Sequence, residues 1–225
     1  MISVSGNRFS GAVEPLVVNT RHGQVVYALD GSGSWGTGVE AAAWFREWIA
    51  SNSKVFEPSP QSVTEALVTA IQSLPDDITD CEFHWSFSLA VAICGSDTVQ
   101  IGSSGSLAAI ALCPNELKHL FVPTRLIEEL VSHGTISADE AQSHKYARII
   151  SSPFFGADNG AELQWSDPIP WCDDDRVVLG DAALPRFLEA HEFTFRTAIE
   201  LRDAIEGFGG SSTSTVIVHR CPTSG

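Results

Sequence analysis

Basic residues are scarce in this chain. Its 225 residues include 13 lysines and arginines against 28 aspartates and glutamates, which gives a formal net charge of −15. This charge repels nucleic-acid phosphates and anionic lipid headgroups, so we expect neither nucleic acid nor a membrane as a partner. It favours a partner with a basic surface, bound in a salt-sensitive way.

Long apolar runs and paired cysteine motifs are also missing. Ser, Gly or Asp interrupts every apolar run well short of a membrane span. The N-terminus has no basic segment followed by an apolar one, which predicts no signal peptide. No two cysteines form a Cys-x-x-Cys pair, so we expect reduced thiols, mostly in the core of a cytoplasmic protein. The five are Cys81, Cys94, Cys113, Cys172 and Cys221.

Several common site patterns are absent. No pair among the seven histidines has zinc-ligand spacing beside a carboxylate or cysteine. The segment Ser104-Gly105-Ser106 lacks the flanking glycine of a nucleophile elbow, which disfavours serine catalysis. The run Asp173-Asp174-Asp175 has neither the spacing nor the central glycine of a calcium loop, and it predicts a solvated turn.

The composition that remains is that of a globular protein. Hydrophobic residues make up 44% of the chain and charged residues 18%, and there is no internal repeat or low-complexity tract. A chain of this length can bury a substantial core. We therefore expect a single domain over residues 1–225.

Hydrophobic periodicity predicts helices in pairs between pairs of strands. Capping boxes are predicted at Ser62 with Glu65 and at Ser137 with Glu140, and the prolines of residues 52–60 predict a loop. This order indicates an α+β protein with two antiparallel sheets flanked by helices. The strands are expected at residues 12–19, 24–29, 83–94, 98–112, 176–179 and 215–219. The helices are expected at residues 38–51, 62–74, 124–133, 137–146, 184–190 and 197–206.

The most informative segment is a strand that ends at Asp30 and passes through a glycine-rich turn into a helix of small residues. Its glycines, from Gly31 to Gly36, match the dinucleotide fingerprint Gly-x-Gly-x-x-Gly, and Glu57 stands near the position of a ribose-binding acid. However, residues 83–112 predict a hairpin where a Rossmann domain would continue, and Asp30 would repel a pyrophosphate. A small-molecule site on this loop is therefore the second of two alternatives.

Six segments in chain order carry a more extensive pattern. Together they resemble the metal-dependent type-2C (PPM-family) serine/threonine protein phosphatases over nearly the full length. The likeness includes an opening arginine, an Asp-Gly turn, a Gly-Asp-Ser-like strand end, a helical segment, a Ser-Asp-Gly-like strand end and a final apolar strand. They are Arg8, Leu29-Asp30-Gly31-Ser32-Gly33, residues 99–104, residues 130–144, Leu179-Gly180-Asp181-Ala182 and residues 212–218.

The resemblance implies a four-layer α-β-β-α sandwich of two antiparallel sheets. It also implies a site where carboxylates and waters hold two divalent ions, Mg²⁺ or Mn²⁺, which activate a water and orient the phosphate. In this chain Arg8 would contact the phosphate. Asp30, the Gly31 carbonyl and Asp181 would be metal ligands.

The sequence departs from the family at the remaining acids. Alignment on Arg8 puts Ala12 and Val13 at the family's Glu-Asp pair, and Ser103 and Ser212 replace two aspartates. Glu14 is one or two residues out of register, which in a strand turns a side chain to the other face. The pair Asp158-Asn159 precedes the wrong strand and is interpreted as a loop.

Each retained residue also has a structural interpretation. Asp30 could be a turn residue capping the region of Gly38, and Asp181 an N-cap ahead of Leu184. Arg8 could be a surface charge.

Loss of these acids to Ala, Val and Ser indicates a discarded site, so we expect a pseudophosphatase with vestigial Arg8, Asp30, Gly31 and Asp181, and no bound cofactor. Its expected role is regulatory: to bind a protein or phosphopeptide, such as a kinase or phosphoprotein with a basic surface. Trp35 in the glycine-rich turn is a candidate interface anchor. The first alternative is a weakly active Mg²⁺- or Mn²⁺-dependent phosphatase that uses Asp30 and Asp181.

Overall fold

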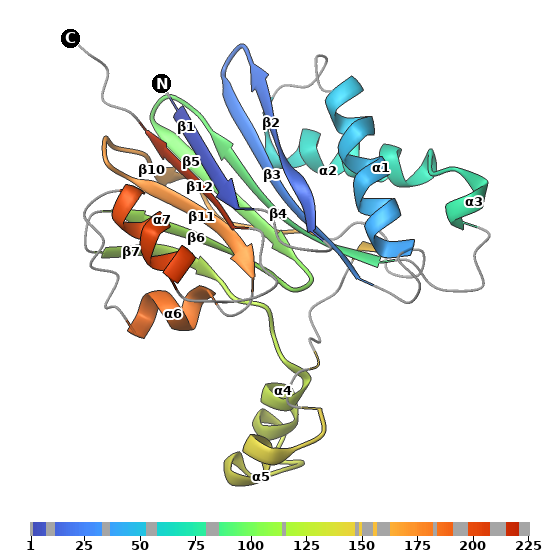
Figure 1. Ribbon diagram of the computed structural model, residues 1–225, viewed down its shortest axis with the longest axis vertical. Coiled ribbons are helices and arrows are strands. Elements are labelled where there is room, and N and C mark those ends of the chain that lie inside the picture. The colour runs from blue at the N-terminus through green and yellow to red at the C-terminus, as the bar shows by residue number, and fades with distance from the viewer. Residues whose placement is uncertain are drawn as a thin grey trace.

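Two antiparallel sheets form the centre of the molecule (Figure 1). The computed structural model describes residues 2–7, 12–32, 37–52, 58–79, 86–113, 116–146, 149, 155–156, 163–181, 184–190, 198–207 and 215–220. The five-stranded sheet has the order β1-β12-β11-β6-β7, with bounds Ile2–Asn7, Thr215–Arg220, Arg176–Asp181, Leu107–Cys113 and Glu116–Phe121. The seven-stranded sheet has the order β10-β5-β4-β3-β2, with bounds Ile169–Pro170, Thr98–Ser104, Ser86–Cys94, Gly23–Ser32 and Ala12–Thr20. The two-residue strands β8 (Phe155–Gly156) and β9 (Gln164–Trp165) pair with β4 and β5.

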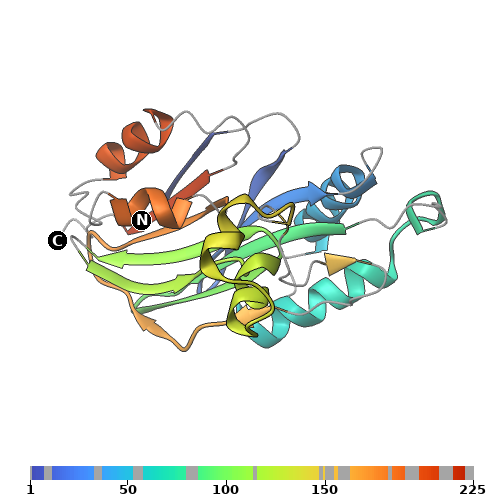
Figure 2. The same cartoon turned by 90° about the horizontal axis from the view of Figure 1, so that it is seen from below.

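Helices cover the outer face of each sheet. The helices α1 (Thr37–Asn52) and α2 (Pro60–Gln72) pack on the seven-stranded sheet, and the short α3 (Asp76–Thr79) follows them. The helices α6 (Leu184–Ala190) and α7 (Ala198–Gly207) pack on the five-stranded sheet. Figure 2 shows the sheets stacked between these two helical layers. The expected four-layer α-β-β-α sandwich is confirmed.

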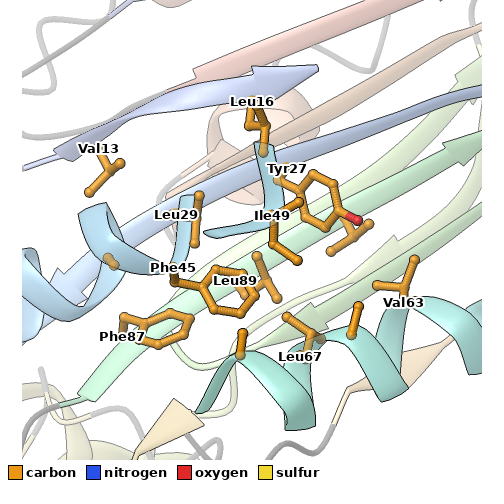
Figure 3. Close-up of a cluster of buried hydrophobic side chains, with 14 of the residues drawn as sticks. Val13, Leu16, Tyr27, Leu29, Phe45, Ile49, Val63, Leu67, Phe87 and Leu89 are labelled. Carbon is orange, nitrogen blue, oxygen red and sulfur yellow. The ribbon is translucent and has the colours of Figure 1, made fainter. Parts of the chain in front are cut away.

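Strand alternation builds three apolar layers. On β4, the large residues Phe87, Leu89 and Val91 face α1 and α2, whereas Ala90 and Ala92 face the other sheet. Figure 3 shows the layer between the seven-stranded sheet and its helices, where Phe87 and Leu89 lie beside Phe45 of α1 and Leu67 of α2. Both faces of the strand are buried, so small residues on the inner face let the two sheets approach closely.

The apolar segment at residues 98–112 is two strands, and the prediction of one is wrong. Gly105 has φ +74°, a left-handed conformation that favours glycine, and it turns the chain between β5 and β6. Because β5 belongs to one sheet and β6 to the other, this turn carries the chain across the sandwich. Composition alone did not separate the two because both strands are apolar.

The start of α2 also differs from the prediction. Its N-cap is Ser59, which forms a capping box with Ser62, and Pro60 occupies the first turn. Proline is favoured there because the first helical amide has no acceptor within the helix. The predicted box at Ser137 and Glu140 is confirmed at the start of α5 (Ala138–Ser143).

The acidic run and the cysteines need two further corrections. Asp175 is buried rather than solvated: its carboxylate lies 2.5 Å from Lys118 Nζ and accepts the Cys172 amide at 2.7 Å. Of the three described cysteines, all free, only Cys94 is buried, so the expectation of mostly core thiols is wrong for this part of the chain. Two others, Cys81 and Cys221, lie outside the described residues.

A two-helix excursion leaves the five-stranded sheet after β7. The helices α4 (Leu126–Ser132) and α5 lie apart from the two sheets in Figure 1. Gly134 at φ +68° ends α4 as expected, and the Leu126 amide bonds the Ile149 carbonyl, which closes the base of the excursion. None of the described helices has the length and apolar character needed to cross a membrane.

Candidate functional site

Polar residues replace the apolar ones at one end of the layer between the sheets. On β3, Val26 and Ala28 lie in this layer, and Asp30 is the next residue on the same face. On β11, Val177 and Leu179 are followed in the same way by Asp181. Alternation therefore directs one carboxylate from each sheet toward the same edge of the sandwich.

The structure brings Asp30 and Asp181 close together. Two effects raise the pKa of Asp30 from its ordinary value of 3.8 to about 6. Burial is the larger one, and the negative charge of Asp181 is the smaller one. Both carboxylates remain partly exposed. The pair is therefore a shared, solvent-accessible negative site in which a proton or a cation relieves repulsion.

Serines occupy the neighbouring positions of the same edge. Ser88 lies directly opposite Asp30 on β4 and is fully buried. Its hydroxyl accepts the Ser106 amide at 2.9 Å and lies 2.8 Å from the Ser106 hydroxyl. Ser103, which continues the inner face of β5, donates to the Leu107 carbonyl. These bonds fasten the β5–β6 turn at the edge where the two carboxylates meet.

Helix α1 begins against the strand end that carries Asp30. A Cβ atom on Gly31 would lie 2.3 Å from the Val39 amide nitrogen and 2.4 Å from its Cα, closer than any side chain permits. Gly31 is therefore required by close backbone contact between β3 and α1. The same contact holds the Asp30 end of the strand in place.

Glu14 does not belong to this site. The register between β2 and β3 shifts between Val13 and Leu16, so residues 14 and 15 form an irregularity. The exposed Glu14 carboxylate lies 3.5 Å from Arg46 of α1, whose Nε also donates to the Glu14 carbonyl. The expectation that Glu14 is out of register agrees with this geometry.

Several residues singled out in the sequence lie outside the described residues: Arg8, Gly33, Trp35, Gly36, Glu57, Asp158, Asn159 and Ser212. Asp30 lies within β3 and is not a turn residue, and Asp181 is the last residue of β11 and not a helix N-cap. Sequence reasoning missed Ser88 and Ser106. Extending each strand's inner-face alternation by one residue would have found Ser88, but the partner in the turn had no periodic signal.

The chemistry available to the described part of this edge is limited. Two carboxylates and the Gly31 carbonyl are oxygen donors of the kind that hard divalent ions prefer. No cluster of three or more His, Cys, Asp or Glu side chains with metal-binding geometry occurs among the described residues. The arrangement can attract a cation, but it supplies few ligand charges.

Structural comparison identifies the fold. The serine/threonine phosphatase Stp1 from Staphylococcus aureus has a TM-score of 0.73 at 13% identity, covering 99% of this chain and 95% of that one. The S. agalactiae serine/threonine phosphatase has a TM-score of 0.71 at 17% identity, with 99% and 100% covered. The catalytic domain of the phosphatase PstP, solved with two manganese ions, has a TM-score of 0.65 at 17% identity, with 96% of each covered.

The chain therefore has the fold of the PPM serine/threonine phosphatases, as the segment order predicted. No protein-family model matches the sequence, and no curated protein sequence matches it either. At 13–17% identity these neighbours define the architecture alone, because one fold can hold sites of different chemistry.

Proposed function

We propose that this protein is a pseudophosphatase: a PPM-type fold that binds a protein or phosphopeptide and does not hydrolyse phosphate efficiently. The observation that carries the proposal is the position opposite Asp30 on β2. That position is Ala12, and the opposite position on β4 is Ser88. Asp30 is thus flanked on both sides by residues that carry no negative charge.

The described residues do not fit a two-ion centre. A pair of divalent ions such as the two manganese ions of PstP carries four positive charges. Mg²⁺ and Mn²⁺ sites rely on several carboxylates to offset such charge. Here the described edge offers Asp30 and Asp181 and no third carboxylate in a metal-binding group. We therefore expect weak or absent binding of both ions.

The missing charges bear directly on rate. Metal-bound water and a metal-held phosphate together supply several kcal/mol of transition-state stabilisation, and each 1.36 kcal/mol corresponds to a factor of about ten. A site that retains two acids loses most of this stabilisation. Hydrolysis of p-nitrophenyl phosphate or a phosphopeptide should therefore be negligible.

The binding role rests on charge and on the retained fold. A net charge of −15 favours association with a basic surface, such as that of a kinase or a phosphoprotein in the cytoplasm. Binding should weaken as salt is added because the attraction is screened. Fluorescence anisotropy with phosphopeptides that have basic or acidic flanks, at several salt concentrations, tests this expectation.

A weakly active phosphatase is the second candidate, favoured by the proximity of Asp30 and Asp181. One assay distinguishes the two candidate functions: the rate of phosphate hydrolysis with Mn²⁺, measured for the wild type and for Asp30→Ala. The control is Asp97→Ala, which removes a carboxylate from the β4–β5 turn at the opposite end of β5. Equal background rates in all three proteins support the pseudophosphatase. Robust turnover that Asp30→Ala alone abolishes refutes it.

A further inference from the structure

The outer face of the helices α1 and α2 presents apolar side chains to solvent. Both helices lie on the side of the seven-stranded sheet that faces away from the five-stranded sheet (Figure 2). On α1, Trp44 and Trp48 pack on the core but remain partly exposed. On α2, Val68 is 39% exposed, and it is one of four exposed large hydrophobic residues among those that the structure describes. Because surface tryptophans are frequent anchors of protein interfaces, this face can bind a partner that offers apolar side chains.

Helical spacing places carboxylates beside these apolar residues. Glu40, Trp44 and Glu47 follow one another at i, i+4 and i+7, so they lie along one side of α1. Glu65 and Val68 are neighbours at i and i+3 on α2. All three glutamates are exposed. Each helix therefore presents a carboxylate next to an apolar side chain.

This face has little positive charge of its own. Described residues 37–52 and 58–79 contain five acids and one basic residue, Arg46. The Arg46 guanidinium is shared between the carboxylates of Glu47 and Glu14, so it leaves a negative excess there. No basic side chain of the described part of the chain pairs with Glu40 or Glu65. The apolar residues are thus framed by uncompensated negative charge.

The sign of this charge decides between the possible occupants. A second copy of the chain would bring the same carboxylates together, and like charges in contact disfavour association. Nucleic acid and anionic lipid are repelled for the same reason. A protein segment with lysine or arginine beside apolar residues complements both the charge and the exposed apolar surface.

We propose that the outer face of α1 and α2 docks a basic amphipathic segment of a protein partner. Its cations pair with Glu40 and Glu65, and its apolar side chains contact Val68 and the two tryptophans of α1. This inference rests on the proposed function, which requires a protein partner. It goes further by placing that partner on the helical layer rather than between the sheets.

The test uses a fluorescein-labelled amphipathic peptide of lysine and leucine, whose binding is followed by fluorescence anisotropy. The double variant Glu40→Gln with Glu65→Gln should weaken binding about fivefold at low salt, because two exposed charge pairs are lost. The matched control is Asp139→Asn with Glu189→Gln, which removes the same charge from exposed positions on α5 and α6. It should weaken binding by about twofold or less, since distant charges are screened.

The apolar part of the contact has its own readouts. Val68→Gln should weaken peptide binding about two- to threefold, because less apolar surface is then buried. The indole N–H signals of Trp44 and Trp48, assigned by replacing each with Phe, should shift in NMR spectra when peptide is added. The signal of Trp171, which is buried between the sheets, should stay in place.

Each other outcome has a definite meaning. Equal weakening by the two double variants shows attraction by net charge alone and overturns this inference. Absence of peptide binding to the wild type overturns it too, as do unchanged indole signals of Trp44 and Trp48. These results leave the expected lack of hydrolysis standing. Mn²⁺-dependent turnover of p-nitrophenyl phosphate by the wild type refutes the proposed function instead, whatever the peptide does.

Discussion

At the scale of single residues, Asp30 makes stability depend on pH. Its folded pKa of about 6 lies above the ordinary value of 3.8, so the folded state holds the proton more tightly. Stability is therefore lost as the pH rises from about 4 to above 6, because the carboxylate then ionises beside Asp181. With a discount for partial exposure, this loss is about 1–2 kcal/mol.

We expect Asp30→Asn to recover that free energy. Urea unfolding should show the variant about 1–2 kcal/mol more stable than the wild type near pH 7.5, and equally stable near pH 4. Asp97→Asn, in an exposed turn, is the control and should show no such crossover. A stabilisation by Asp30→Asn that is the same at both pH values contradicts the assignment.

Gly31 is the second residue whose replacement has a definite cost. A methyl group there would collide with backbone atoms of Val39, which cannot rotate away, so Gly31→Ala should destabilise the fold by about 2–4 kcal/mol. Gly134→Ala is the control: its Cβ meets no atom within 4 Å, and its cost is only the left-handed backbone, about 1 kcal/mol. Chemical denaturation of both variants measures the difference, and equal losses would contradict the contact between β3 and α1.

At the scale of elements, Ser88 joins β4 to the turn between β5 and β6. Ser88→Ala leaves the Ser106 amide without its acceptor, which should cost about 1–3 kcal/mol. Ser106→Ala keeps that amide bond and loses only the contact between the hydroxyls, so its cost should be about 1 kcal/mol or less. Unfolding free energies of both variants give the comparison, and the reverse order would show that the amide bond is not the main one.

Element boundaries show what sequence could and could not predict. The helix at residues 184–190 was predicted with its observed bounds, and the strand β11 was predicted with its observed start at Arg176. In both cases the apolar periodicity begins where a turn-forming segment ends. The break at Gly105 was missed because apolar residues continue on both sides of it. The short strand β7 was missed because its residues are half-buried and mixed in polarity.

The candidate site was likewise predicted from the sequence only in part. Asp30 was predicted because it ends an apolar strand before a glycine-rich turn, whereas Asp181 was predicted through the resemblance to the PPM phosphatases. Their approach to each other depends on how two sheets stack, which no local pattern encodes. Ser88 was missed because a buried serine between apolar residues looks like ordinary strand composition.

At the scale of the whole molecule, the excess of negative charge should weaken the folded state. A net charge of −15 repels itself most at low ionic strength, where the Debye length is long. Raising sodium chloride from about 0.02 to 0.3 M should therefore raise the thermal midpoint by about 2–4 °C, equivalent to about 1 kcal/mol. Calorimetric scans provide the measurement. A midpoint that falls or stays constant would show that the charges are already compensated by ion pairs.

The pairing of β1 with β12 has a consequence for synthesis on the ribosome. Residues 2–7 pair with residues 215–220, and β12 separates β1 from β11 in the sheet. While the ribosome is still making the middle of the chain, β1 has been translated but its neighbour does not yet exist. The seven-stranded sheet draws on residues 12–170 and can assemble first. Its inner apolar face then stays uncovered by β12 until residues 215–220 have been translated, and chaperones that shield such surfaces should bind the nascent chain during this interval.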